Sequence, residues 1–116
     1  MTPRTPSELH VARFLVLWGR PDDPAAFERH YRDVHIPLAL KIPGLRRYSL
    51  SRDIAAVRGK DPHYLVAELE FDNLGSLRSG FQSPEGQATA RDVATLAAYA
   101  TVTSMMYELE DASRPR

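Results

Sequence analysis

The chain has 116 residues, which is enough for one domain with one hydrophobic core and too few for two. Its 15 Lys and Arg residues balance its 15 Asp and Glu residues, so no net field attracts a nucleic acid or an anionic membrane. Cysteine is absent, which excludes disulfides and thiolate metal sites, and no apolar run approaches the length of a membrane span.

The two ends of the chain are expected to be flexible segments on either side of one domain. Residues 1–9 contain two prolines and several polar residues, and residues 111–116 have a similar character. The domain is therefore predicted to span residues 10–110. The start of the chain has no apolar run of the kind found in secretion signals, so we expect a soluble, cytoplasmic protein.

The first predicted elements are a strand and an amphipathic helix. Residues 10–19 are rich in β-formers and end at a glycine, which favours a strand. Asp23 then stands where a helix N-cap belongs, with Pro24 in the first helical position. The helix has one apolar stripe whose members recur at steps of three and four residues: Phe27, Tyr31, Val34 and Leu38.

Two further strands follow this helix. A Pro-Gly turn at residues 43–44 leads into a strand over residues 45–54. After a loop, residues 63–71 form another strand, in which four alternating side chains share one apolar face: Leu65, Ala67, Leu69 and Phe71.

The last third of the chain is predicted to hold two helices and a final strand. Asp72 is placed to cap a short helix over residues 73–81. Ser83, with a proline behind it, marks the start of an Ala-rich helix that runs towards Tyr99. Residues 101–110 then form the last strand.

This order of elements predicts an α+β fold of the ferredoxin-like type. A β-α-β unit followed by β-α-α-β makes two similar halves, the split βαβ plan with a four-stranded antiparallel sheet and helices on one face. Residues 14–18 of the first strand are apolar on both faces, and the helices can cover only one of them. We therefore expect a homodimer in which two such sheets face each other.

Several motifs, taken in order, resemble the EthD domain. They are Asp23-Pro24, the H-x-P of His35 and Pro37, the PGL of residues 43–45 and the SPEGQ of residues 83–87. The family is named for ethyl tert-butyl ether degradation and belongs to the dimeric α+β barrel superfamily, so the resemblance implies that fold and a dimer. It implies less about chemistry, because the superfamily includes isomerases, polyketide cyclases, cofactor-free oxygenases and haem-degrading enzymes.

His35 is the leading candidate for a catalytic residue. Pro37 lacks a backbone N–H, so we expect the helix to stop near His35 and Ile36 to leave the helical region. The imidazole would then lie beside the core, with one nitrogen held by a freed carbonyl and the other exposed to exchange a proton near neutral pH. The alternative is a structural role in which the ring only caps those carbonyls.

Aromatic residues are candidates for the walls of a substrate site: Trp18, Tyr31, Tyr48, Tyr64 and Phe81. A tyrosine there could donate a hydrogen bond to an enolate or phenolate oxygen, although each of these residues could equally belong to the core. Glu68 lies on the strand face away from the helices. An ion pair with Arg13 or Arg47 is the favoured role for it, and a buried base is the alternative.

No metal or cofactor site is predicted. None of the four histidines, His10, His30, His35 and His63, forms a pair spaced for helical metal binding, and the middle two lie about 140° apart on a helix. Glycine-rich phosphate loops, GxSxG and zinc motifs are also absent. In the polyketide cyclases of the superfamily a catalytic histidine stands two residues after a proline, and here that position is Gly86, so that role does not carry over.

The favoured hypothesis is an enzyme that moves a proton without a cofactor on a small apolar molecule bearing a carbonyl or aromatic group. Cyclisation, dehydration, decarboxylation and isomerisation all fit, with His35 as general acid or base. One alternative is a non-catalytic ligand-binding or accessory protein of a degradation or oxygenase pathway. Another is a cofactor-free or haem-dependent monooxygenase. Neither a nucleic acid nor a membrane is expected as a partner.

Overall fold

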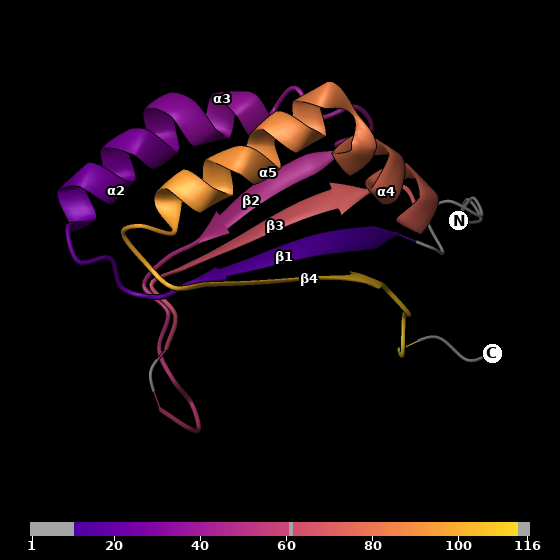
Figure 1. The fold of residues 1–116 in the computed structure, drawn as a ribbon. Coiled ribbons are helices and arrows are strands. Elements are labelled where there is room, and N and C mark those ends of the chain that lie inside the picture. The colour runs from indigo at the N-terminus through magenta and orange to yellow at the C-terminus, as the bar shows by residue number, and fades with distance from the viewer. Residues whose placement is uncertain (1–10, 61, 114–116) are drawn as a thin grey trace.

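In the computed structural model, residues 11–60 and 62–113 form a four-stranded antiparallel sheet with the helices on one of its faces (Figure 1). The strands lie in the order β2-β3-β1-β4. Their bounds are Ala12–Trp18 for β1, Arg47–Ser51 for β2, Leu65–Phe71 for β3 and Val102–Glu108 for β4. This is the ferredoxin-like arrangement that the order of elements predicts.

The helices form two groups on that face (Figure 1). The first group consists of α2 (Pro24–His30), the π-helical turn η1 (Tyr31–His35) and α3 (Ile36–Ala39). The second consists of α4 (Leu74–Gln82) and α5 (Pro84–Leu96). The predicted N-terminal segment and residues 114–116 of the predicted tail lie outside the described residues.

Two of the three predicted helix caps are confirmed. Asp23 accepts a hydrogen bond from the backbone N–H three residues on at 3.1 Å, and Ser83 does the same at 3.0 Å. The prediction for α4 is wrong by one residue. Asn73 has the extended backbone of an N-cap and accepts the capping bond at 2.8 Å, while the Asp72 carboxylate pairs with Arg46.

The first helix widens at the proline instead of stopping, so the predicted end at His35 is wrong. The N–H of Ile36 binds the carbonyl of Tyr31, five residues back, and Ile36 keeps helical angles of φ −58° and ψ −48°. A wider turn relieves the clash between a proline ring, here that of Pro37, and the carbonyl four residues before it.

The extra residue in the π-helical turn changes which side chains face inward. Four residues at intervals of four are buried along this helix: Phe27, Tyr31, His35 and Ala39. Val34, which the sequence pattern placed in the apolar stripe, is 39% exposed. The predicted stripe therefore fails at Val34, and His35 lies within the buried row instead of beside the core.

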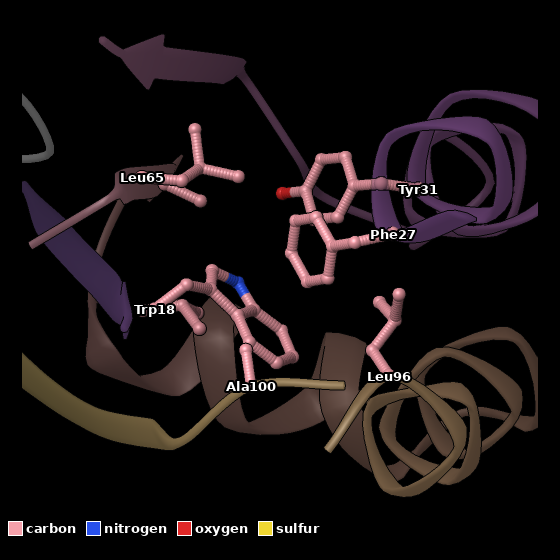
Figure 2. Close-up of a cluster of buried hydrophobic side chains, with 8 residues drawn as sticks. Trp18, Phe27, Tyr31, Leu65, Leu96 and Ala100 are labelled. Atoms are coloured by element: carbon pink, nitrogen blue, oxygen red, sulfur yellow. The ribbon is translucent and has the colours of Figure 1, made fainter. Parts of the chain in front are cut away.

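The core between helices and sheet is built largely from aromatic contacts (Figure 2). Trp18 at the end of β1 is fully buried, and its ring meets Phe27 edge to face with centroids 5.3 Å apart. Phe27 in turn stacks on Tyr31 at 5.6 Å. The four predicted inward side chains of β3 are all buried. These contacts fasten α2 and η1 to the sheet and set the position of His35.

The helices α4 and α5 meet so closely that a side chain cannot fit at Gly86. A Cβ atom there would lie 2.2 Å from the carbonyl oxygen of Gly80 and 2.5 Å from the Cα of Phe81. Both are backbone atoms, so relief would require one helix to move. The close crossing of the two helices explains why position 86 is a glycine.

Gly86→Ala is expected to lower the free energy of unfolding by roughly 1–3 kcal/mol, because the added methyl group overpacks the helix crossing. Urea denaturation followed by circular dichroism measures the change. Arg91→Ala, at an exposed position of the same helix, is the matched control and should stay within about 0.5 kcal/mol of the native protein. Equal stability of the two variants would show that the helices separate easily at this crossing.

Candidate active site

The candidate active site is centred on Asp92, whose two carboxylate oxygens bind two different imidazoles. Oδ2 lies 2.8 Å from Nδ1 of His35, and Oδ1 lies 2.8 Å from Nε2 of His30. Asp92 comes from α5 and the histidines from α2 and η1, so the cluster joins the two groups of helices. His35 and Asp92 are 6% and 9% exposed, whereas the His30 side chain is 25% exposed.

These contacts determine which nitrogen of each ring carries a proton. A carboxylate only accepts hydrogen bonds, so His35 donates through Nδ1–H and His30 through Nε2–H. In the neutral His35 ring, Nε2 is then unprotonated, and it has no hydrogen-bond partner among the described residues. Nor is it among the fully buried unpaired atoms of that part of the chain. Its lone pair is therefore available to take a proton.

Burial lowers the pKa of His35 below its ordinary value of 6.5. The hydrogen bond to Asp92 and the charge of that carboxylate oppose the effect of burial, while the charge of His30 adds to it. His35 is consequently neutral at cellular pH, the form that can act as a base. Once protonated, the imidazolium would be stabilised by Asp92.

The ring of Tyr31 lies against His35, and its hydroxyl is hydrogen-bonded to that of Tyr48. The oxygens of Tyr31 and Tyr48 are 2.6 Å apart, and the Tyr31 ring centroid is 5.1 Å from that of His35. Burial raises the pKa of Tyr48 to about 12 and also raises that of Tyr31, so both hydroxyls keep their protons at cellular pH. Only one of the two protons lies between the oxygens, so the pair has a second O–H to donate.

Four of the five predicted aromatic site residues gather in one cluster, which Figure 2 shows in part. Trp18 and Tyr31 are buried within it, and Tyr48 and Tyr64 pack against it. Phe81, the fifth, comes from α4 and belongs to a second cluster, where its ring centroid lies 4.5 Å from that of Phe14. Phe14 and Tyr48 contact both clusters, so the two groups are continuous.

Trp18 has a buried indole N–H with no hydrogen-bond partner among the described residues. In Figure 2 this nitrogen is on the side of the ring that faces Phe27 and Tyr31. Leaving a buried donor unpaired costs about 1–3 kcal/mol. The N–H is therefore a donor that an oxygen atom of a ligand would satisfy.

Tyr64 belongs to a polar network beside the aromatic cluster. Its hydroxyl donates to Glu28 at 2.6 Å, and Arg52 binds the same carboxylate through two bonds of 2.8 and 2.9 Å. Burial alone would raise the pKa of Glu28, but the hydrogen bonds from Arg52 and Tyr64 outweigh it and lower the pKa. The Tyr64 hydroxyl is thus engaged by an ionised Glu28, and its ring packs on Phe27 at 6.0 Å.

Asp92 is the site residue that the sequence pattern did not reveal. It lies in an Ala-rich helix at steps of three and four from Thr89 and Leu96, and all three are buried. A carboxylate within the buried stripe of a helix is unusual unless it is paired. A carboxylate in an otherwise apolar or small-residue stripe is the sequence signal that could have pointed to Asp92. The signal can be used only when the buried face of the helix is already known.

The expected ion pairs on the open face of the sheet are also corrected. Arg13 pairs with Glu70 at 3.2 Å, because these two residues lie directly opposite each other on β1 and β3. Glu68 lies opposite Leu15 on one side and Ser49 on the other. The strand register therefore pairs Arg13 with Glu70 and not with Glu68.

Residues 11–60 and 62–113 contain no group of three His, Asp or Glu side chains placed to hold a metal ion. His10, one of the four histidines, lies outside these ranges. Within the same ranges no helix is long and apolar enough to cross a bilayer.

Comparison with known proteins identifies the family. Residues 20–99 match the model of the EthD domain. An uncharacterised 11.0 kDa protein from the thcB–thcC intergenic region of Rhodococcus erythropolis is 37% identical over 86 residues, which cover 73% of this chain and 82% of that protein.

Two solved structures extend the comparison. An EthD family protein of Bacillus halodurans superposes with a TM-score of 0.74 at 32% identity, over 85% of this chain and 98% of that one. The cofactor-independent oxygenase SnoaB of Streptomyces nogalater shares the fold, with a TM-score of 0.63 at 20% identity over 88% and 95% of the two chains. The protein is a member of the EthD family.

Proposed function

We propose that this protein is an enzyme that moves a proton on a small apolar organic molecule, with His35 as the base. The observation that carries the proposal is the buried His35 ring, held by Asp92 through Nδ1 at 2.8 Å and left with a free lone pair on Nε2. A base oriented by a carboxylate is the arrangement that general acid–base catalysis requires. Cyclisation, dehydration, decarboxylation and isomerisation are the reaction classes that it serves.

The reaction consists of two proton transfers that restore the enzyme. In the isomerisation of a β,γ-unsaturated ketone, Nε2 of His35 removes a proton from the carbon between the carbonyl group and the double bond, and the electron pair of that C–H bond moves to give a conjugated dienolate. Asp92 stabilises the imidazolium so formed. The imidazolium then returns the proton to a different carbon of the substrate as the carbonyl re-forms, which leaves His35 neutral again.

The aromatic residues supply the proposed binding site. The spare O–H of the Tyr31–Tyr48 pair and the unpaired N–H of Trp18 are donors for the developing enolate oxygen. The rings of Tyr64 and Phe81 would contact the apolar part of the substrate. A site with mostly apolar walls and a few polar groups suits a small carbonyl or aromatic compound.

His35 is expected to be a neutral ring at pH 7 with its proton on Nδ1 and none on Nε2. Long-range proton–nitrogen NMR spectra of the ¹⁵N-labelled protein distinguish the two tautomers without any substrate. The titration midpoint should lie below 6.5, and turnover should fall as the pH drops through that midpoint, because protonation removes the base. A neutral ring with its proton on Nε2 would contradict the assignment of His35 as base.

A second candidate function is that of a non-catalytic ligand-binding or accessory protein. The observation that favours it is the close packing around the site, where Trp18, Tyr31 and His35 are all buried and their rings are in contact. In that case Asp92 and the histidines would serve only to join the helices. The fold shared with SnoaB keeps a cofactor-free oxygenase as a third candidate, which oxygen uptake in the presence of aromatic ketones would reveal.

We also propose that the protein acts as a homodimer through the open face of its sheet. Leu15 and Leu17 of β1 point to this face, opposite the helices, and Met105 of β4 lies beside Leu15 with 44% exposure. Figure 1 shows the helices on the other side of the sheet. Apolar strand residues of this kind are ordinarily covered by a second layer. Proteins of this fold from Bacteroides fragilis and Thermobifida fusca are dimeric, which supports the proposal.

A further inference from the structure

His30 is a partly exposed residue that contacts Asp92, and the proposed reaction gives it no role. Its Nε2 is hydrogen-bonded to Oδ1 of Asp92 at 2.8 Å. Nδ1 of His35 is hydrogen-bonded to Oδ2 of the same carboxylate, also at 2.8 Å. Unlike His35, its side chain is one-quarter exposed and therefore reaches solvent. One carboxylate thus links a buried imidazole to an imidazole that is partly exposed to water.

We propose that His30 is a positioning residue for the acid–base pair, holding one oxygen of Asp92 so that the other faces His35. This inference rests on the proposed function, because it concerns the same base. It adds His30, which acts on that base indirectly because both histidines bind Asp92.

The geometry is the first reason for this role. A buried carboxylate that makes one hydrogen bond can turn about its side-chain bonds, whereas one held at both oxygens from two helical segments cannot. With His30 removed, Oδ1 of Asp92 would lose its partner, and the side chain would turn towards solvent to recover one. His35 would then lose the bond that orients its ring.

Charge is the second reason. The charged groups that act on His35 are Asp92 from α5, which favours its protonated form, and His30 from α2, which opposes it. Tyr31, whose ring lies against His35, stays neutral because burial raises its pKa. The charge of His30 lowers the pKa of His35, so the loss of that charge should make His35 easier to protonate.

Two substitutions separate positioning from charge. His30→Gln can place an amide N–H where Nε2 lies and keep the bond to Asp92, but it has no charge. His30→Ala removes both. The NMR titration of His35 and the pH profile of turnover are measured for both variants, with Arg29→Gln at an exposed neighbouring position as the control.

His30→Gln is expected to preserve the His35 tautomer and to move its titration midpoint, and the acid limb of the pH profile, to higher pH. His30→Ala should disturb the tautomer and lower turnover roughly 10- to 100-fold, with most of the loss restored by glutamine. The inference is overturned if both variants leave the His35 titration and tautomer unchanged. That result would not affect the proposed function, which fails instead if removal of the His35 base leaves turnover intact.

Discussion

His35→Asn is expected to lower turnover roughly 10²- to 10⁴-fold while the protein stays folded. The asparagine side chain can place an N–H where Nδ1 lies, so the bond to Asp92 survives, but it has no group at the position of Nε2. The variant therefore removes the base and keeps the link between the helices. Small aromatic ketones and enones are the compounds to test, and kcat/KM is compared for native protein and variant.

Circular dichroism and thermal unfolding of the same samples show whether a loss of rate reflects the chemistry or the fold. Asp92→Asn is the complementary variant. An amide cannot accept hydrogen bonds at both ends, so one of the two histidines must change its tautomer or lose its bond. Undiminished turnover by a folded His35→Asn protein would remove His35 from the mechanism, whereas a native protein that turns over none of these compounds would favour the non-catalytic candidate.

Leu17→Asp is expected to convert a dimer into monomers. Leu17 lies near the end of β1, a central strand of the sheet, between Val66 and Thr103 of the neighbouring strands and on the face away from the helices. If two sheets pack there, the substitution places a carboxylate in a dry interface, at a cost of several kcal/mol per ion. Sedimentation equilibrium should give about twice the 13.1 kDa chain mass for the native protein and the single chain mass for the variant.

Leu40→Asp provides the matched control for this experiment. Leu40 directly follows α3 and is 61% exposed, so the same change of side chain there should leave the dimer intact. A native protein that sediments as a strict monomer at micromolar concentration would contradict the proposed interface. The apolar side chains of the open face would then need a different partner.

The predicted strands were accurate because strand periodicity is a local property. Alternation of side chains across β3 correctly predicted which four residues are buried. The order of elements then permits few topologies, so the ferredoxin-like sheet could be predicted. The motifs around His35 and Ser83 pointed to the EthD family, and the match over residues 20–99 confirms it.

The face of the first helix could not be predicted in the same way. An ideal helical period put Val34 in the core, whereas a π-helical turn ahead of Pro37 buries His35 instead. Whether a proline ends a helix or widens it depends on the contacts available to the residues around it. Here the aromatic rings of Phe27 and Tyr31 pack together and against Trp18 of the sheet, and this packing favours a helix that continues past the proline.

From its own pattern, the chain determines a small α+β domain, its strands and two of its three helix caps, because these depend on neighbours within a few residues. The pairing of His35 with Asp92 joins positions 57 residues apart, and the Tyr31–Tyr48 contact joins positions 17 apart. Such contacts depend on how the helices pack against the sheet and against one another. Only the tertiary structure could therefore show that His35 is held by a carboxylate whose other oxygen binds a second histidine.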